Sequence, residues 1–261
     1  MPDLEQALVI SNNEVGPSLF EMELAASQTV PLCQPGQFVH LRVSSTHDPL
    51  LRRPLSLYDV DKNRGTITLL YKIAGRGTDL LSRTQAGSYI DIMGPLGRPF
   101  SFPTAGKTVV LVGGGVGIAP LLYLARQLME KGCGVKVLYG SQCSRELVAL
   151  PRFQQLGVDI ETAAWDLESG YQGLVTDLLA ERISGQNIGF LYTCGPEPMM
   201  AKVAEYARRY NLKGELSLEQ HMACGVGACL GCARKLADRD SHYVKVCKDG
   251  PVFGLDEVEV N

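Results

Sequence analysis

The sequence predicts a multi-domain protein of the α/β plus β class, in which an all-β unit is followed by an α/β unit and a small cysteine-rich module. Short apolar strands occupy about the first hundred residues, and strand and helix patterns alternate over about the next hundred. Four of the eight cysteines lie after position 223. A chain of 261 residues usually forms two domains or more, and we expect these units to span 1–102, 103–214 and 215–261.

The composition is that of an ordinary globular protein. Hydrophobic residues make up 45% and charged residues 20%, which excludes a disordered or fibrous chain. The net charge of −3 argues against a nucleic-acid partner, which would require a basic excess. Residues 1–6 show no signal peptide, and the uncharged stretch 108–125 is too rich in glycine for a membrane helix. We therefore expect a cytoplasmic protein without a membrane span.

The first unit is predicted to consist of strands. Phe20, Met22 and Leu24 alternate with glutamates, which is the period of a half-buried strand. Glycine and proline turns separate further strands expected over 38–43, 55–60, 66–73 and 89–93. Several short strands at this spacing indicate a small barrel or a sandwich.

The second unit is predicted to be a parallel sheet covered by helices. A β-branched run at 108–112 precedes a helical stretch at 121–131 and a strand at 135–139. The alternation continues through 158–163, 175–183, 188–193 and 197–210. Alternating strands and helices are typical of a parallel sheet.

The cysteine module carries the strongest chemical signal. Cys224, Cys229, Cys232 and Cys247 follow the order C-x4-C-x2-C…C, which is the plant-type 2Fe–2S spacing. We expect Gly225, Gly227 and Gly231 to supply unusual backbone angles and to expose amides to the sulfurs. The alternative is a structural zinc site, although zinc normally requires a second closely spaced cysteine pair.

Two loops of the α/β unit are candidates for binding a dinucleotide. The first follows strand 108–112 and contributes Gly113, Gly114, Gly115, Gly117 and Pro120, whose backbone amides can hold a pyrophosphate. A plain strand-to-helix turn is the alternative, because Ile118 fills the last glycine position of the usual motif and no acid ends the next strand. The second loop contributes Cys194, Gly195, Pro196 and Met199.

A short motif in the all-β unit is a candidate for binding flavin. Arg53-Pro54-Leu55-Ser56 combines a guanidinium that can pair with phosphate and a hydroxyl that can bond a flavin nitrogen. Gly77 and Thr78 open a helical stretch that can hold the same phosphates. A solvated arginine before a strand is the alternative.

Together these motifs resemble the ferredoxin–NADP reductase superfamily. The ending S-L-E-Q-H-M-A-C-G-V-G-A-C-L-G-C is similar to the electron-transfer subunits of class B dihydroorotate dehydrogenase, and the resemblance covers essentially the whole chain. It implies an antiparallel β-barrel for FAD, a parallel sheet for NAD and a C-terminal 2Fe–2S module. It also implies that the strand Leu70, Tyr71 and Lys72 lies along the flavin.

The resemblance implies an NAD-dependent flavin and iron–sulfur oxidoreductase subunit of pyrimidine biosynthesis, with no catalytic residue for dihydroorotate itself. It would pass electrons between an FMN-containing catalytic subunit and NAD+, in a heterotetramer with two copies of each. Arg145 leaves NADP open, and we favour a packing role for Cys194 over a reactive thiol. Trp165, Asp166 and Glu168 either lie near the dinucleotide or form a plain loop.

Two other interpretations remain open at this point. The first is a diaphorase-type small subunit of a ferredoxin-dependent NAD(P)H oxidoreductase, a sulfide dehydrogenase, a hydrogenase or a sulfite reductase. The second, of a different class, is a non-enzymatic redox sensor or a zinc-stabilised binding module.

Overall fold

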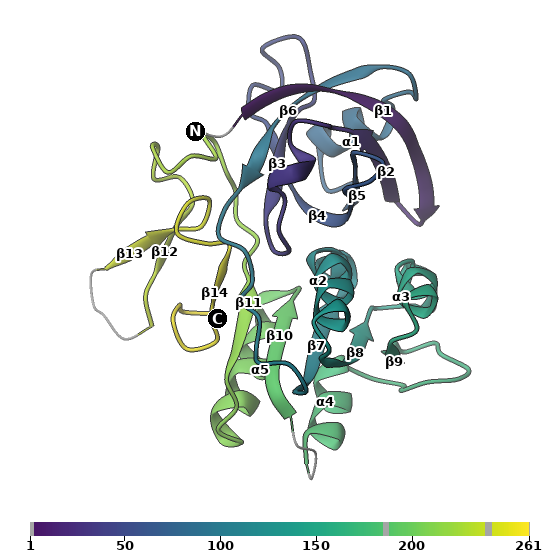
Figure 1. The fold of residues 1–261 in the computed structure, drawn as a ribbon, viewed down its shortest axis with the longest axis vertical. Coiled ribbons are helices and arrows are strands. Elements are labelled where there is room, and N and C mark those ends of the chain that lie inside the picture. The colour runs from purple at the N-terminus through teal and green to yellow at the C-terminus, as the bar shows by residue number, and fades with distance from the viewer. Residues whose placement is uncertain (1–2, 185–187, 238–241, 261) are drawn as a thin grey trace.

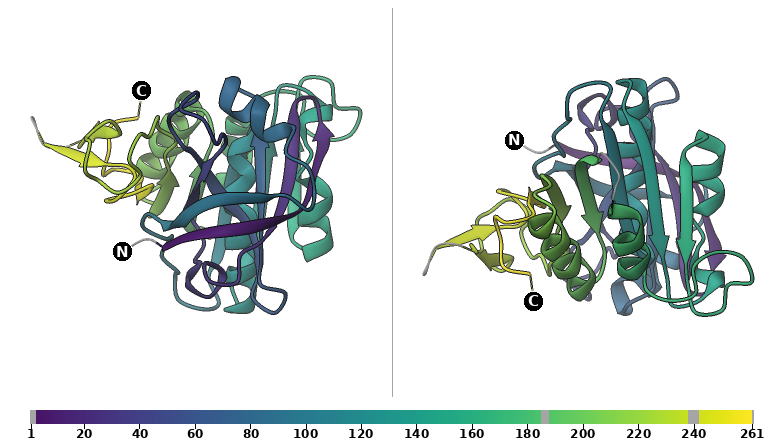
Figure 2. Two further views of the ribbon diagram at one scale, coloured as in Figure 1. Left: turned by 90° about the horizontal axis from the view of Figure 1, so that it is seen from above. Right: turned by 90° about the horizontal axis from the view of Figure 1, so that it is seen from below.

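The computed structural model describes residues 3–184, 188–237 and 242–260, and it confirms the predicted fold class. A barrel lies above an α/β sheet, and the cysteine-rich segment lies beside both (Figure 1). Figure 2 shows that this segment projects from one side of the molecule, next to β11 and α5. No helix of the described ranges is long and apolar enough to cross a membrane.

Six antiparallel strands close into the barrel in the order β1-β2-β5-β4-β3-β6. Their alternating apolar residues fill its interior; Met22, Leu41 and Leu69 are fully buried. The strands are β1 Asp3–Gly16, β2 Leu19–Ala25, β3 Phe38–Arg42, β4 Arg53–Asp61, β5 Thr66–Lys72 and β6 Tyr89–Leu96, with α1 Arg76–Ser82 between the last two.

The second unit is a six-stranded sheet in the order β14-β11-β10-β7-β8-β9. Val110 and Val112 of β7 pack on α4 and α5, whereas Val109 and Leu111 pack on α2. In Figure 1, α2 lies between the sheet and the barrel. The elements are β7 Thr108–Gly114, α2 Ala119–Glu130, β8 Gly134–Gly140, α3 Leu150–Leu156, β9 Asp159–Ala163, α4 Val175–Ile183, β10 Ile188–Cys194, α5 Glu197–Arg209 and β11 Gly214–Ser217.

The cysteine-rich segment is joined to this sheet by its own last strand. β14 (Val252–Gly254) pairs antiparallel with β11, and Val252 and Phe253 are buried. Before it, β12 (Ala233–Lys235) and β13 (Tyr243–Lys245) form a two-stranded ribbon. The expected boundary between 214 and 215 falls inside β11. The division of the chain into three units remains a prediction.

Candidate functional site

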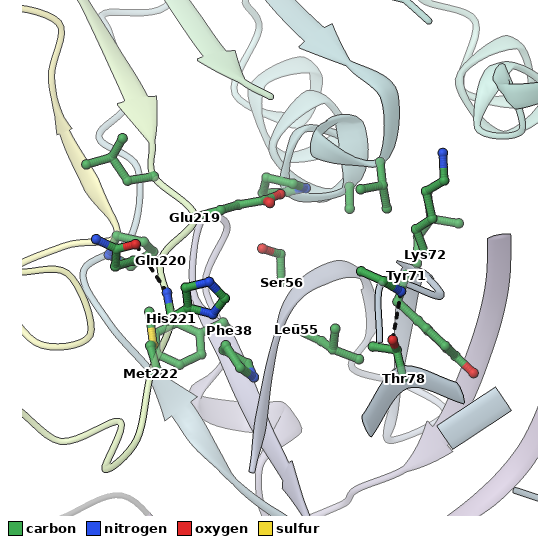
Figure 3. A pocket seen from close by; sticks show the side chains of 18 residues that line it. Phe38, Leu55, Ser56, Tyr71, Lys72, Thr78, Glu219, Gln220, His221 and Met222 are labelled. Atoms are coloured by element: carbon green, nitrogen blue, oxygen red, sulfur yellow. Dashed lines mark hydrogen bonds between the residues drawn. The ribbon is translucent and has the colours of Figure 1, made fainter. Parts of the chain in front are cut away.

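A cavity of about 410 Å³ lies where the barrel meets the sheet, and we call it the barrel pocket (Figure 3). Strands β4 and β5 form one side, and the start of α2 and the segment 218–222 form the other. Of the residues expected to bind FAD, the structure places seven in its lining: Pro54, Leu55, Ser56, Leu70, Tyr71, Lys72 and Thr78.

Arg53 and Gly77, the other two residues expected at FAD, lie outside this lining and contact each other. Arg53 begins β4, and a Cβ at position 77 would overlap its guanidinium, so glycine permits this contact. Nη1 of Arg53 donates to the carbonyl of Leu51 at 2.5 Å. Nearby, the hydroxyl of Thr78 accepts from the amide of Ala74 at 2.9 Å. The guanidinium therefore lies against the turn that leads into α1.

The segment 218–222 contains pocket residues that the sequence analysis missed. In Figure 3, Glu219 lies across the barrel pocket from Ser56, and His221 lies beside Phe38. Protein atoms crowd around the Glu219 carboxyl, and this desolvation raises its pKa although the side chain remains open to the pocket. The position of this segment in the sequence could have indicated these residues, because a segment that joins β11 to Cys224 must cross the carboxyl edge of the sheet.

A second cavity of about 880 Å³ lies at the carboxyl edge of the parallel strands, and we call it the sheet pocket. The predicted loop residues in its lining are Gly114, Gly115, Gly117, Gly195, Pro196 and Met199. Three other predicted residues lie elsewhere. Gly113 packs against Ile118 beneath the loop, Pro120 lines the barrel pocket, and Cys194 is buried.

The two loops of the sheet pocket touch each other. A Cβ at Gly117 would lie 2.5 Å from the Cα of Gly195, so only glycine allows this approach. Gly115 has φ +55° and faces open space, which leaves its backbone accessible to a ligand. Cys194 is only 1% exposed, and burial raises the pKa of its thiol well above the usual value. These facts favour a packing role for Cys194.

The two pockets lie side by side. Lys72, Val116 and Glu219 line both of them. A flavin ring in the barrel pocket and a nicotinamide in the sheet pocket would therefore meet near Glu219.

The four module cysteines lie in a shell of backbone donors. Amides of Val226, Ala228 and Cys229 point at the sulfur of Cys224 over 3.3–3.5 Å. Other amide-to-sulfur bonds run from Gly227 to Cys247 at 3.1 Å, from Gly231 to Cys229 at 3.4 Å and from Cys247 to Cys232 at 3.4 Å. Although desolvation opposes them, the amide bonds lower the pKa of Cys224 to about 6. Such donors stabilise thiolate sulfur.

The backbone of the cysteine loop differs from the expectation at one glycine. Gly225 and Gly227 have φ of +70° and +80°, as predicted. Gly231 does not have a positive φ, and Leu230 takes that conformation instead, with φ +60°. The turn before Cys232 therefore reverses one residue earlier, and Gly231 contributes only its amide.

The sulfurs lie in two pairs, an arrangement that the two irons of a 2Fe–2S cluster can take up. Cys224 lies against Cys229, and Cys232 lies against Cys247. A [2Fe–2S] cluster takes four cysteine ligands for two irons, whereas zinc requires its ligands around one centre.

His40 of β3 packs against this loop from the barrel side. Its ring is fully buried, neither ring nitrogen has a hydrogen-bond partner in the structure, and Nδ1 faces Gly225. Desolvation lowers its pKa to about 4, so the imidazole is neutral. A buried unpartnered imidazole is costly. It fits a site that is completed by a bound group on the cysteine side of the barrel.

Comparisons with known proteins match each part of the chain. The iron–sulfur cluster binding domain of dihydroorotate dehydrogenase B matches residues 219–259, an oxidoreductase NAD-binding domain matches 111–205, and an oxidoreductase FAD-binding domain matches 4–100. The chain is 37% identical to the electron transfer subunit of dihydroorotate dehydrogenase B (NAD+) from Desulforamulus reducens, over 97% of each protein. It is 40% identical to that of Bacillus caldolyticus, over 97% of this chain and 98% of the other.

Solved structures show the same architecture. A chain of the NADH-dependent reduced ferredoxin–NADP oxidoreductase, studied for flavin-based electron bifurcation, superposes with a TM-score of 0.89 at 26% identity, over 98% of this chain and 90% of the other. An Amycolatopsis cytochrome P450 reductase gives a TM-score of 0.67 at 25% identity, over 80% of this chain and 67% of the other.

Proposed function

The chain belongs to the family of electron transfer subunits of NAD+-dependent dihydroorotate dehydrogenase B, and from this premise we propose how its residues connect the partner enzyme with NAD+. Electrons released by dihydroorotate oxidation on an FMN-containing catalytic subunit reach NAD+ through the 2Fe–2S cluster and FAD. When bound, these two groups supply the conversion between single-electron and two-electron transfer. The complex serves pyrimidine biosynthesis in the cytoplasm, with two copies of each subunit.

One observation carries this proposal: a single segment connects all three sites. Residues 218–222 line the barrel pocket, and Glu219 also lines the sheet pocket. The first module cysteine, Cys224, lies two residues after the end of this segment. One short segment thus borders the proposed sites of the dinucleotide, the flavin and the cluster.

The residues divide the work of binding. Arg53 would pair with the FAD phosphates beside Gly77, and Ser56, which lies across the pocket from Glu219, would bond the flavin ring. The backbone amides of Gly115 and Gly117 hold the dinucleotide pyrophosphate. Cys224, Cys229, Cys232 and Cys247 hold the cluster, and the amides around their sulfurs stabilise its negative charge. FAD and NAD would approach each other where Lys72, Val116 and Glu219 line both pockets.

Reconstitution with the catalytic subunit tests the proposal. The purified chain is expected to reduce a dye with NADH and to leave dihydroorotate untouched, because no constellation for ring deprotonation is present among its described side chains. Adding the FMN-containing subunit restores dihydroorotate-dependent NAD+ reduction. Oxidation of dihydroorotate by the isolated chain would refute this division of labour.

A pair of cysteine variants isolates the role of the cluster. Cys229→Ala removes a ligand and is expected to abolish coupled turnover while sparing much of the dye reduction. Cys143→Ala removes a half-buried cysteine outside the module and leaves both activities unchanged. Stoichiometric zinc without acid-labile sulfide in anaerobic protein would contradict the cluster itself.

The likeness to the NADH-dependent ferredoxin–NADP oxidoreductase chain favours a second candidate, a diaphorase-type small subunit. Here the cofactors and sites are the same, and the partner differs. The test is to offer the purified chain either the FMN-containing subunit with dihydroorotate or the larger subunit of that oxidoreductase with reduced ferredoxin. Coupling only to the second would replace our proposal.

A further inference from the structure

The second strand of the parallel sheet ends without the acid that commonly binds the adenosine ribose. β8 ends at Gly140 and is followed by Ser141, neither of which carries a carboxylate. An acid from the next loop lies close to the same place. Asp166 follows β9 and reaches across to the loop that follows β8.

Two hydrogen bonds hold Asp166 in this position. Oδ1 accepts from the backbone amide of Ser144 at 2.6 Å, and Oδ2 accepts from the Ser144 hydroxyl at 3.1 Å. The neighbouring residues Gln142 and Trp165 both line the sheet pocket. The Ser144–Asp166 pair therefore lies at the rim of the cavity assigned to the dinucleotide.

The charges around this rim disfavour an additional phosphate. The amide of Ser144 and the charge of Arg145 lower the pKa of Asp166, so the carboxylate is ionised at neutral pH. The same proximity means that Asp166 offsets Arg145, the cation that left NADP open. The two lysines of the pocket lining are also paired: Lys72 with Glu146 at 2.7 Å and Lys202 with Glu205 at 2.8 Å.

We propose that Asp166 is the residue that selects NAD+ over NADP+, accepting a hydrogen bond from the ribose 2′-hydroxyl and repelling a 2′-phosphate. This inference rests on the proposed function, because it requires the dinucleotide to bind in the sheet pocket. It places the selecting acid on the loop after β9 rather than at the end of β8.

The test compares two uncharged variants of the same loop in the holoenzyme. Asp166→Asn removes the selecting charge, and Glu168→Gln removes an exposed charge two residues away as the matched control. Calorimetry measures the binding of ADP-ribose and 2′-phospho-ADP-ribose, and stopped-flow absorbance measures flavin reduction by NADH and NADPH. We expect Asp166→Asn to shift both preference ratios toward the 2′-phosphorylated compound by about tenfold or more. Glu168→Gln leaves them unchanged.

A double variant identifies the cation that gains the phosphate. Arg145→Ala in the Asp166→Asn background is expected to reverse most of the gain, because Arg145 is then free to pair with the 2′-phosphate. Asp166→Ser serves as a second, shorter replacement with the same expected shift.

The possible failures are distinguishable. Unchanged preference ratios in Asp166→Asn and Asp166→Ser, with normal FAD content, would overturn the role of Asp166 alone. An equal shift in Glu168→Gln would do the same, since the effect would then be one of general charge. If the wild-type holoenzyme binds neither ribose compound and neither nucleotide reduces its flavin, both this inference and the proposed dinucleotide site are wrong.

Discussion

Two charged side chains, one beside the barrel pocket and one in its lining, favour or oppose the binding of phosphate there. Arg53 brings a cation to the turn before α1, and Glu219 brings a carboxyl to the wall shared with the sheet pocket. The first favours phosphate and the second opposes it when ionised. At the residue scale, therefore, the proposed FAD site needs these two groups to lie apart, with the phosphates at Arg53 and away from Glu219.

Arg53→Ala is expected to weaken FAD binding. Loss of a buried charge pair with phosphate typically costs about 2–5 kcal/mol, so the variant should be purified largely without flavin. Fluorescence titration of the apoprotein with FAD measures the change. Arg83→Ala, which removes an exposed ion pair with Asp79 on α1, is the control and retains FAD. An Arg53→Ala protein with wild-type FAD affinity would exclude the phosphate contact.

Glu219→Gln is expected to remove a step in the pH dependence of nucleotide binding. Desolvation raises the pKa of Glu219, so the carboxyl is neutral below that pKa and charged above it. Its carboxyl lines the sheet pocket, which is proposed to hold the pyrophosphate, and a negative charge there opposes an anionic ligand. ADP-ribose should therefore bind more weakly as pH rises through the raised pKa. Calorimetry between about pH 5 and about pH 9 detects the step. Glu168→Gln should retain it; an identical profile in Glu219→Gln would show that another group titrates.

At the scale of elements, β14 determines how the cysteine module is held. It pairs with β11 through three residues, and Phe253 lies buried in the same core as α4 and α5. The residues between these two strands include all four cysteines. The strands β11 and β14 therefore hold both ends of the module in the sheet, although the module's own two-stranded ribbon is small.

Removal of iron is expected to loosen only part of this segment. Chelation under reducing conditions should increase amide hydrogen exchange over residues 219–237 and 242–249, because the cluster would join four cysteines spread along them. The amides of β14 should stay protected. Phe253→Ala is the contrasting variant: it should cost about 3–5 kcal/mol of stability and release β14 as well. Exchange of β14 on chelation of the wild-type protein would mean that the cluster, rather than the strand, holds the end.

The predictability of these elements followed the strength of their local signals. Strands such as β2 and β7 were predictable because their apolar residues alternate or run together. β1 was missed because polar side chains dilute its pattern; one of them, Asn12, donates to the carbonyl of Leu81 in α1. β14 was missed because three residues carry no periodicity.

The site residues, too, were predictable only where a local sequence pattern marked them. The cysteine spacing and the loop glycines were visible as short motifs, and the structure brings the four cysteines together. Asp166 and Glu219 lay in no motif that assigned them a contact. Asp166 bonds a residue 22 positions earlier, and Glu219 depends on how the barrel meets the sheet. Only tertiary packing creates such sites.

At the scale of the whole molecule, the cluster side has exposed apolar residues beside it. Val226 and Leu230 on the cysteine loop are 41% and 64% exposed, and Leu32 on the adjoining barrel loop is 53% exposed. Leu32, Val226 and Cys247 line one shallow cavity. This side is therefore the expected contact for the catalytic subunit.

Leu230→Asn is expected to weaken the complex without loss of the cluster. Asparagine suits the φ of +60° at this position, so the loop should keep its conformation. The affinity for the FMN-containing subunit, measured by biolayer interferometry, should fall by about tenfold or more, since an exposed apolar contact is lost. Dye reduction with NADH should not change. Val15→Asn, at a 40% exposed position of β1, is the control; equal affinities for Leu230→Asn and wild type would move the contact elsewhere.

The pairing of β11 with β14 also constrains the order in which the protein is made. During synthesis, β11 leaves the ribosome before any of the four cysteines, and β14 leaves after all of them. Until then the sheet ends in an unpaired edge, which is a surface that invites aggregation or chaperone binding. A nascent chain can therefore close this sheet only once its complete set of iron ligands has been translated, so the finished edge marks a polypeptide ready to receive its cluster.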